Sequence, residues 1–140
     1  MVEVRELVSE DELRSTFEVV RQLRPHLTAE NYLSELRVVL DGGARLIACF
    51  HGTRVVGCGV FRVLRKLYLG TSIYVDDLIT DENTRSQGVG KALLEWIEAE
   101  AQRQGIDWVT LDSGVQRDQA HKFYFRQGYT VACFNFKKKL

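Results

Sequence analysis

The chain has 140 residues, of which 45% are hydrophobic, and its 19 lysines and arginines balance 19 aspartates and glutamates. This size predicts a single globular domain over residues 1–140, and the balanced charge argues against a nucleic-acid or anionic-membrane partner. The sequence has no signal-peptide pattern and no apolar run near the roughly 18 residues of a membrane span, so we expect a soluble cytoplasmic protein.

The first 43 residues predict a strand followed by two helices. Val2 and Val4 alternate with charged residues, which is typical of a half-buried strand. Ser9, with Glu12 three residues later, predicts the start of a helix over residues 9–23. A second helix is expected from Thr28 onward, ended by Asp41 and the two glycines after it.

The rest of the chain alternates β-rich and helical patterns. Helices are expected after Gly88 and over residues 117–127. Strands are expected for residues 44–50, 54–64, 71–80, 107–112 and 129–138. The order β-α-α-β-β-β-α-β-α-β predicts an α/β (α+β) fold, a mixed and mostly antiparallel sheet of about six strands with helices on both faces.

The cysteines and histidines suggest neither disulfides nor a metal site. No Cys-x-x-Cys pair occurs, so we expect reduced thiols in the core at Cys49, Cys58 and Cys133. The histidines have no spacing typical of metal ligands: His26, His51 and His121. We therefore predict no bound metal.

The stretch "TRSQGVGKALLEWIE", residues 84–98, places two glycines at a helix entrance. The first turn of a helix has unpaired backbone N–H groups and the positive end of the helix dipole, and glycines at 88 and 90 let an anion approach. Two familiar nucleotide loops do not fit: the dinucleotide motif needs glycine where Leu93 stands, and the Walker loop needs a hydroxyl where Ala92 stands.

The remaining pattern, Arg-x-x-Gly-x-Gly, resembles the pyrophosphate-binding motif of the GNAT superfamily of N-acetyltransferases. A second family motif, Ala-x-x-x-Tyr-x-x-x-Gly-Tyr, is matched by "AHKFYFRQGY" from Ala120 to Tyr129. The resemblance covers essentially the whole chain in the family's order of elements. Residues 114–129 and the lysine-ended final strand also resemble the branch that includes aminoalkylphosphonate N-acetyltransferase.

The resemblance implies acetyl-coenzyme A as co-substrate. The expected pyrophosphate loop consists of Arg85, Ser86, Gln87, Gly88, Val89, Gly90 and Lys91. Arg85 and Lys91 would supply countercharge. The strand end formed by Leu78, Ile79 and Thr80 would contact the pantetheine arm. Arg117 stands where many members have an asparagine that contacts the cofactor, and an arginine there could reach a cofactor phosphate instead.

The implied reaction is attack of an amine on a thioester, which needs a base for the ammonium and an acid for the departing thiolate. Tyr124 matches the family's general acid. Strand alternation places Tyr74, Asp76 and Leu78 on one face and Asp77 on the other. Asp76 is the candidate base, with Asp77 or a water relay as alternatives.

We therefore expect direct acetyl transfer to a primary amine of a small molecule, in a monomer or a homodimer. The alternatives are a non-catalytic acyl-coenzyme A sensor and an enzyme that acetylates a protein or peptide amine. The region expected to bind the acceptor, "RQLRPHLTAENY", is either an ordinary helix surface or a site where Arg21, Arg24 or His26 meets an acidic substrate group.

Overall fold

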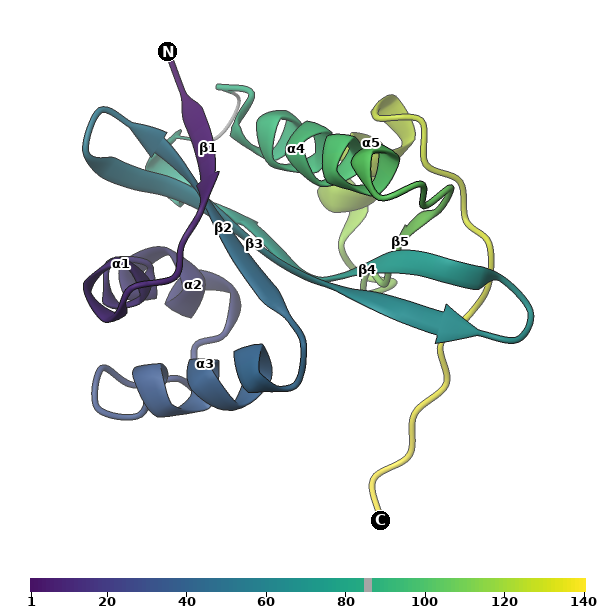
Figure 1. Ribbon diagram of the computed structural model, residues 1–140, viewed down its shortest axis with the longest axis horizontal. Coiled ribbons are helices and arrows are strands. Elements are labelled where there is room, and N and C mark those ends of the chain that lie inside the picture. The colour runs from purple at the N-terminus through teal and green to yellow at the C-terminus, as the bar shows by residue number, and fades with distance from the viewer. Residues whose placement is uncertain (85–86) are drawn as a thin grey trace. The chain divides into compact units, whose positions relative to one another are not determined.

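A computed structural model describes residues 1–84 and 87–140 of the chain (Figure 1). The chain forms two compact units, residues 1–110 and 111–140. The helices are α1 (Glu10–Arg14), α2 (Phe17–Leu23), α3 (Tyr32–Asp41), the short 3₁₀ helix η1 (Glu82–Thr84), α4 (Val89–Arg103) and α5 (Asp118–Arg126). The strands are β1 (Glu3–Glu6), β2 (Arg45–His51), β3 (Arg54–Lys66), β4 (Gly70–Thr80) and β5 (Val109–Leu111).

Within the described residues the strands form one open sheet in the order β1-β2-β3-β4-β5. The ladders from β1 to β4 are antiparallel, as expected from consecutive strands joined by short turns. The mixed α/β fold predicted from the sequence is confirmed. In residues 1–84 and 87–140 the sheet has five strands, however, and not about six.

The missing strand is the one expected at residues 129–138, which have no regular secondary structure. Aromatic and β-branched residues there have local strand propensity, but a strand also needs a ladder partner for its backbone groups. Cys133 lies in this segment and is exposed, so its predicted burial was wrong, whereas Cys49 and Cys58 are buried free thiols.

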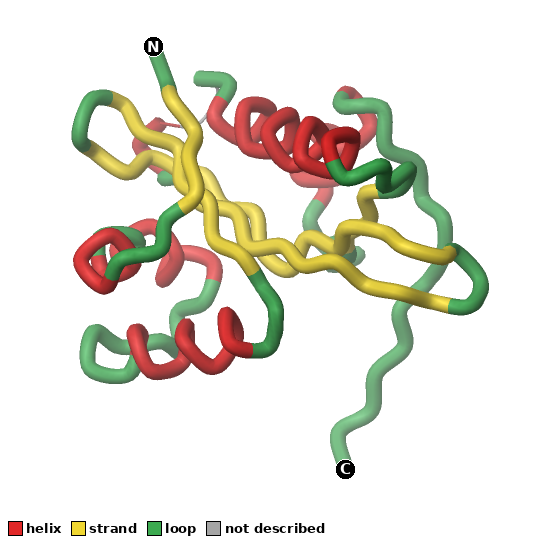
Figure 2. The backbone as a smooth tube through the Cα atoms, in the orientation of Figure 1, coloured by secondary structure: helices red, strands yellow, loops and turns green. Residues whose placement is uncertain are grey.

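Helices cover both faces of the sheet in residues 1–110: α1, α2 and α3 lie on one face and α4 on the other (Figure 2). The α1–α3 face closes over a hydrophobic cluster that includes Leu36, Cys58, Val60 and Ile79. The α4 face buries Phe61, whose ring centroid is 6.0 Å from that of Trp96. These two cores hold β3 and β4 rigidly between helical layers.

The first predicted helix begins as expected but is divided. Ser9 and Glu12 form the predicted capping box. The Ser15 hydroxyl then donates to the Glu12 carbonyl and the Thr16 hydroxyl to the Leu13 carbonyl, both at 2.6 Å. Because these side chains compete with the helical backbone bonds, the helix ends and restarts as α2.

Gly57 on β3 lets the first turn of α4 approach the sheet. A Cβ at this position would overlap the Val89 side chain and lie 3.1 Å from both the Ile79 carbonyl oxygen and Leu93 Cδ1. We expect Gly57→Ala to lower the free energy of unfolding by about 1–3 kcal/mol through overpacking.

Urea unfolding measures this change, with Gly42→Ala as the control. Gly42 has φ −77° at the end of α3, and an added Cβ there would make only ordinary contacts of 3.4 and 3.5 Å. Equal free energies of unfolding for Gly57→Ala and the wild type would show that α4 does not pack this closely.

Candidate functional site

The glycine-rich helix entrance predicted from the sequence begins α4. Gly88 is the N-cap residue with φ 77°, in the left-handed region that disfavours a side chain, and as a glycine it has no side chain of its own to cap the helix end. Helix geometry leaves the backbone N–H groups of the first turn without intrahelical partners. Space within 4 Å of a Cβ built on Gly88 is open, so an anion can approach.

The other loop residues have different environments. Val89 is 2% exposed and packs its side chain against the sheet, so it anchors the helix entrance. Gln87 is exposed. Lys91 lies 3.7 Å from Glu95 in an exposed ion pair along the helix. Arg85 and Ser86 lie outside the described residues, and their roles stay predictions.

The strand end that precedes this loop is well anchored. Leu78 pairs with Gly59, Ile79 with Cys58 and Thr80 with Gly57 across the β3–β4 ladder. The ladder continues past the strand, because the Asp81 N–H donates to the Val56 carbonyl at 2.9 Å. The backbone predicted to contact the pantetheine arm is therefore fixed by β3.

A β-bulge in β4 changes the predicted alternation. Val60 pairs with Asp77 and Phe61 with Val75, which leaves Asp76 as the extra residue. Val60 belongs to the α1–α3 core, so Asp77 lies on that side of the sheet. Arg62, two residues after Val60, returns to the same side and binds the Asp76 carboxylate. The two carboxylates therefore share a face, and the prediction that they point apart was wrong.

Each of these carboxylates is ion-paired. Arg62 Nε donates to Asp76 Oδ1 at 3.0 Å and its guanidinium also binds Oδ2. Arg24 Nε, at the end of α2, donates to Asp77 Oδ1 at 2.7 Å. The side chain of Asp76 is only 18% exposed, and that of Asp77 only 22%. The result is a charge-balanced group of two arginines and two aspartates.

The sequence interpretation missed the role of Arg62 and gave Arg24 only as a substrate contact. Arg62 could have been found, because a β3–β4 hairpin places it beside the middle of the next strand. Of the other acceptor candidates, Arg21 pairs with Glu18 on its own helix at 2.8 Å, and His26 is exposed.

The unit of residues 111–140 carries the second sequence motif on α5. Ala120 and Tyr124 lie one turn apart on this helix, which ends before Gly128 as expected. Burial raises the pKa of Tyr124, and Arg117, the N-cap residue, only partly opposes this shift. The phenol therefore stays protonated at neutral pH, the form that a general acid needs.

In residues 1–84 and 87–140, no three histidine, cysteine or acidic side chains gather in a way that could hold a metal ion. No helix in the same residues is long and apolar enough to cross a membrane.

Comparison with protein families identifies the chain. The model of the acetyltransferase (GNAT) family matches residues 4–129. The chain belongs to this family. GNAT enzymes use acetyl-coenzyme A as co-substrate, and this chain is an acetyl-coenzyme A-dependent acyltransferase.

Individual relatives agree with the family. The chain is 30% identical to the "uncharacterized N-acetyltransferase YhdJ" of Bacillus subtilis over 141 residues, which cover 99% of each chain. It is 36% identical to the aminoalkylphosphonate N-acetyltransferase of Salmonella typhimurium over 66 residues, 47% of this chain and 43% of that one. The structure of AAC(6')-Iy in complex with the bisubstrate analog CoA-S-monomethyl-acetylneamine has a similar fold, with a TM-score of 0.84. The two sequences are 13% identical, and the match covers 100% of this chain and 99% of that one.

Proposed function

We propose that the chain transfers the acetyl group of acetyl-coenzyme A directly to the primary amine of a small molecule. The observation that carries this proposal is the charge-balanced group on β4, in which Arg24 and Arg62 already neutralise Asp77 and Asp76. A lysine-bearing protein segment favours unpaired carboxylates, which attract a cation over a wide surface. A group of paired arginines and aspartates suits a small amine that has its own acidic substituent. The ammonium of such a substrate can bind an aspartate, and its acidic substituent can bind an arginine.

In the proposed reaction the amine nitrogen attacks the thioester carbonyl carbon, and the carbon–sulfur bond breaks. Asp76 takes the proton that the ammonium loses, either directly or through a water. Tyr124 gives its phenolic proton to the coenzyme A thiolate, and the second proton, which the attacking nitrogen loses as it becomes an amide, returns through water to the Tyr124 phenolate. The first turn of α4, with Gly88 and the expected cations Arg85 and Lys91, holds the pyrophosphate. The proposed transfer is direct, without an acyl-enzyme, and the buried thiols of Cys49 and Cys58 are not accessible as nucleophiles.

The other cofactor contacts follow from the same proposal. The backbone of Leu78, Ile79 and Thr80 would bind the pantetheine arm, and Arg117 would reach a cofactor phosphate. The relation to an aminoalkylphosphonate N-acetyltransferase supports an acceptor that carries both an amine and an anionic group.

An amine panel tests the function. Thiol release from acetyl-coenzyme A is measured with 2-aminoethylphosphonate, a small amino acid, an alkylamine without an acidic group and a lysine-containing peptide. We expect turnover with amines that carry an acidic group, and weaker turnover with the simple alkylamine. Turnover with the peptide alone would reject the small-molecule assignment.

The role of Asp76 is tested with a neutral side chain of the same shape. We expect Asp76→Asn to lower kcat/KM for the amine about 10²-fold, the low end for a positioned base, because Arg62 already occupies part of the carboxylate. Asp77→Asn is the matched control on the same face. It should raise KM with little change in kcat, because Asp77 holds Arg24 and the chain after α2. An unchanged kcat/KM for Asp76→Asn would assign the proton to Asp77 or to water.

A further inference from the structure

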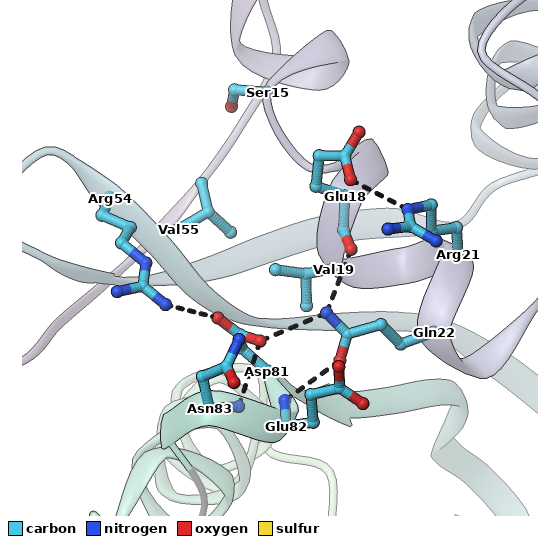
Figure 3. Close-up of a pocket in the computed structure, with 10 residues that line it drawn as sticks. All are labelled: Ser15, Glu18, Val19, Arg21, Gln22, Arg54, Val55, Asp81, Glu82 and Asn83. Carbon is cyan, nitrogen blue, oxygen red and sulfur yellow. Dashed lines mark hydrogen bonds and ion pairs between the residues drawn. The ribbon is translucent and has the colours of Figure 1, made fainter.

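A pocket lies between the α1–α2 junction and the end of β4, and the Gln22 side chain is one of the groups that line it (Figure 3). The Gln22 side chain starts on α2 and reaches the chain that leads into η1. Its Nε2 donates to the Glu18 carbonyl at 3.1 Å and to Asp81 Oδ1 at 3.2 Å. Its Oε1 accepts the Glu82 N–H at 3.0 Å. One carboxamide thus joins a helix to the first residues beyond β4.

Asp81 is the centre of this group. Its side chain is 8% exposed, and Arg54 donates to its Oδ2 at 2.7 Å. The Asn83 N–H donates to its Oδ1 at 3.3 Å, which closes the turn into η1. The hydrogen bond from Arg54 holds the pKa of Asp81 below its usual range despite burial, so the carboxylate is charged at neutral pH.

This polar group lies on the chain between β4 and α4. Residues 81–84 follow directly after β4 and precede the glycine turn at Gly88 by only a few residues, of which Arg85 and Ser86 lie outside the described residues. A loop that is already held in place costs less conformational entropy when a ligand orders it. Gln22 is the side chain that ties both Asp81 and Glu82 to a separate helix.

We propose that Gln22 is a positioning residue for the glycine turn at Gly88, where α4 begins. It holds Asp81 and Glu82 so that the N–H groups at Gly88 and the following turn are pre-arranged for the coenzyme A pyrophosphate. This inference rests on the proposed role of the Gly88 turn. The helix α2, whose C-cap residue Arg24 binds Asp77 on β4, then also holds the chain that leaves β4 ahead of this turn.

The test compares two substitutions. Gln22→Met keeps the length of the side chain but removes every hydrogen bond. Gln22→Glu keeps an acceptor for the Glu82 N–H but places a negative charge beside Asp81. We expect the Kd for coenzyme A to rise about 3- to 10-fold in Gln22→Met, as for the loss of one or two hydrogen bonds, and further in Gln22→Glu. With both substrates saturating, kcat should stay within about twofold of the wild type.

The control is Gln102→Met, on an exposed turn of α4 away from this group. Hydrogen exchange gives a second readout: the Glu82 amide should exchange faster in Gln22→Met, while the buried Leu93 and Ile97 amides should not. Wild-type affinity for coenzyme A in both Gln22 variants, or an equal loss in Gln102→Met, would overturn the inference. If one Gln22 variant does not fold, the other still decides. Absence of coenzyme A binding by the wild type would instead reject the phosphate site itself.

Discussion

Gly88→Leu should weaken coenzyme A binding at least about 10²-fold, which corresponds to losing two or more hydrogen bonds to a charged group. Gly88 has φ 77° and open space around its Cβ position. A leucine there would fill the space that the pyrophosphate needs, and it would also strain the left-handed backbone by about 1–3 kcal/mol. Calorimetric titration with coenzyme A measures the affinity.

The control must separate strain from lost binding. Gly105 follows the other end of α4, also has a positive φ, 70°, and also has open space around its Cβ position. Gly105→Leu should therefore lower the free energy of unfolding by a similar amount and leave the coenzyme A affinity near that of the wild type. Equal loss of affinity in both variants would mean that Gly88 serves only the fold.

Tyr124→Phe should lower kcat about 10²-fold and leave the Kd for coenzyme A nearly unchanged. The substitution keeps the ring, whose centroid lies 5.3 Å from that of Phe123 and 6.1 Å from that of Tyr129, so local packing survives. What it removes is the proton for the departing thiolate. The size of the loss reflects a positioned acid for which solvent water substitutes in part.

The pH dependence gives a further test of Tyr124. Burial raises its pKa above the ordinary tyrosine value of about 10, so the phenol remains an acid at about pH 9, where more of the amine is deprotonated. The rate should therefore fall only above the ordinary tyrosine pKa. Tyr68→Phe, at an exposed position 75% accessible to solvent, is the control. Near wild-type kcat for Tyr124→Phe would make Tyr124 a packing residue and the thiolate an unassisted leaving group.

Local patterns predicted much of the fold. The spacing of Ser9 and Glu12 predicts a capping box, and the chain forms one. The glycines after Asp41 end α3 as expected. These features depend on residues a few positions apart, so the sequence displays both partners. The helix entrance at Gly88 was predicted for the same reason.

Features that depend on distant partners were missed. The bulge at Asp76 arises from the register between β3 and β4, and a strict alternation cannot reveal it. Because of this one extra residue, Asp76 and Asp77 face the same arginine-bearing side. The polar group around Gln22 joins residues about 60 positions apart, so no short sequence motif predicts it. The expected strand at residues 129–138 failed because propensity does not supply a pairing partner.

The proposed acetyl transfer requires that the entrance of α4 hold the pyrophosphate of coenzyme A. A calorimetric comparison of coenzyme A with pantetheine tests this: pantetheine has the same thiol arm but lacks the pyrophosphate and the 3'-phosphoadenosine, and the variant Arg85→Ala separates the pyrophosphate from the rest. We expect the wild type to bind coenzyme A at least about 10²-fold more tightly than pantetheine, and Arg85→Ala to remove most of this difference. Equal affinities for the two ligands, or no coenzyme A binding at millimolar concentration, would contradict this proposal.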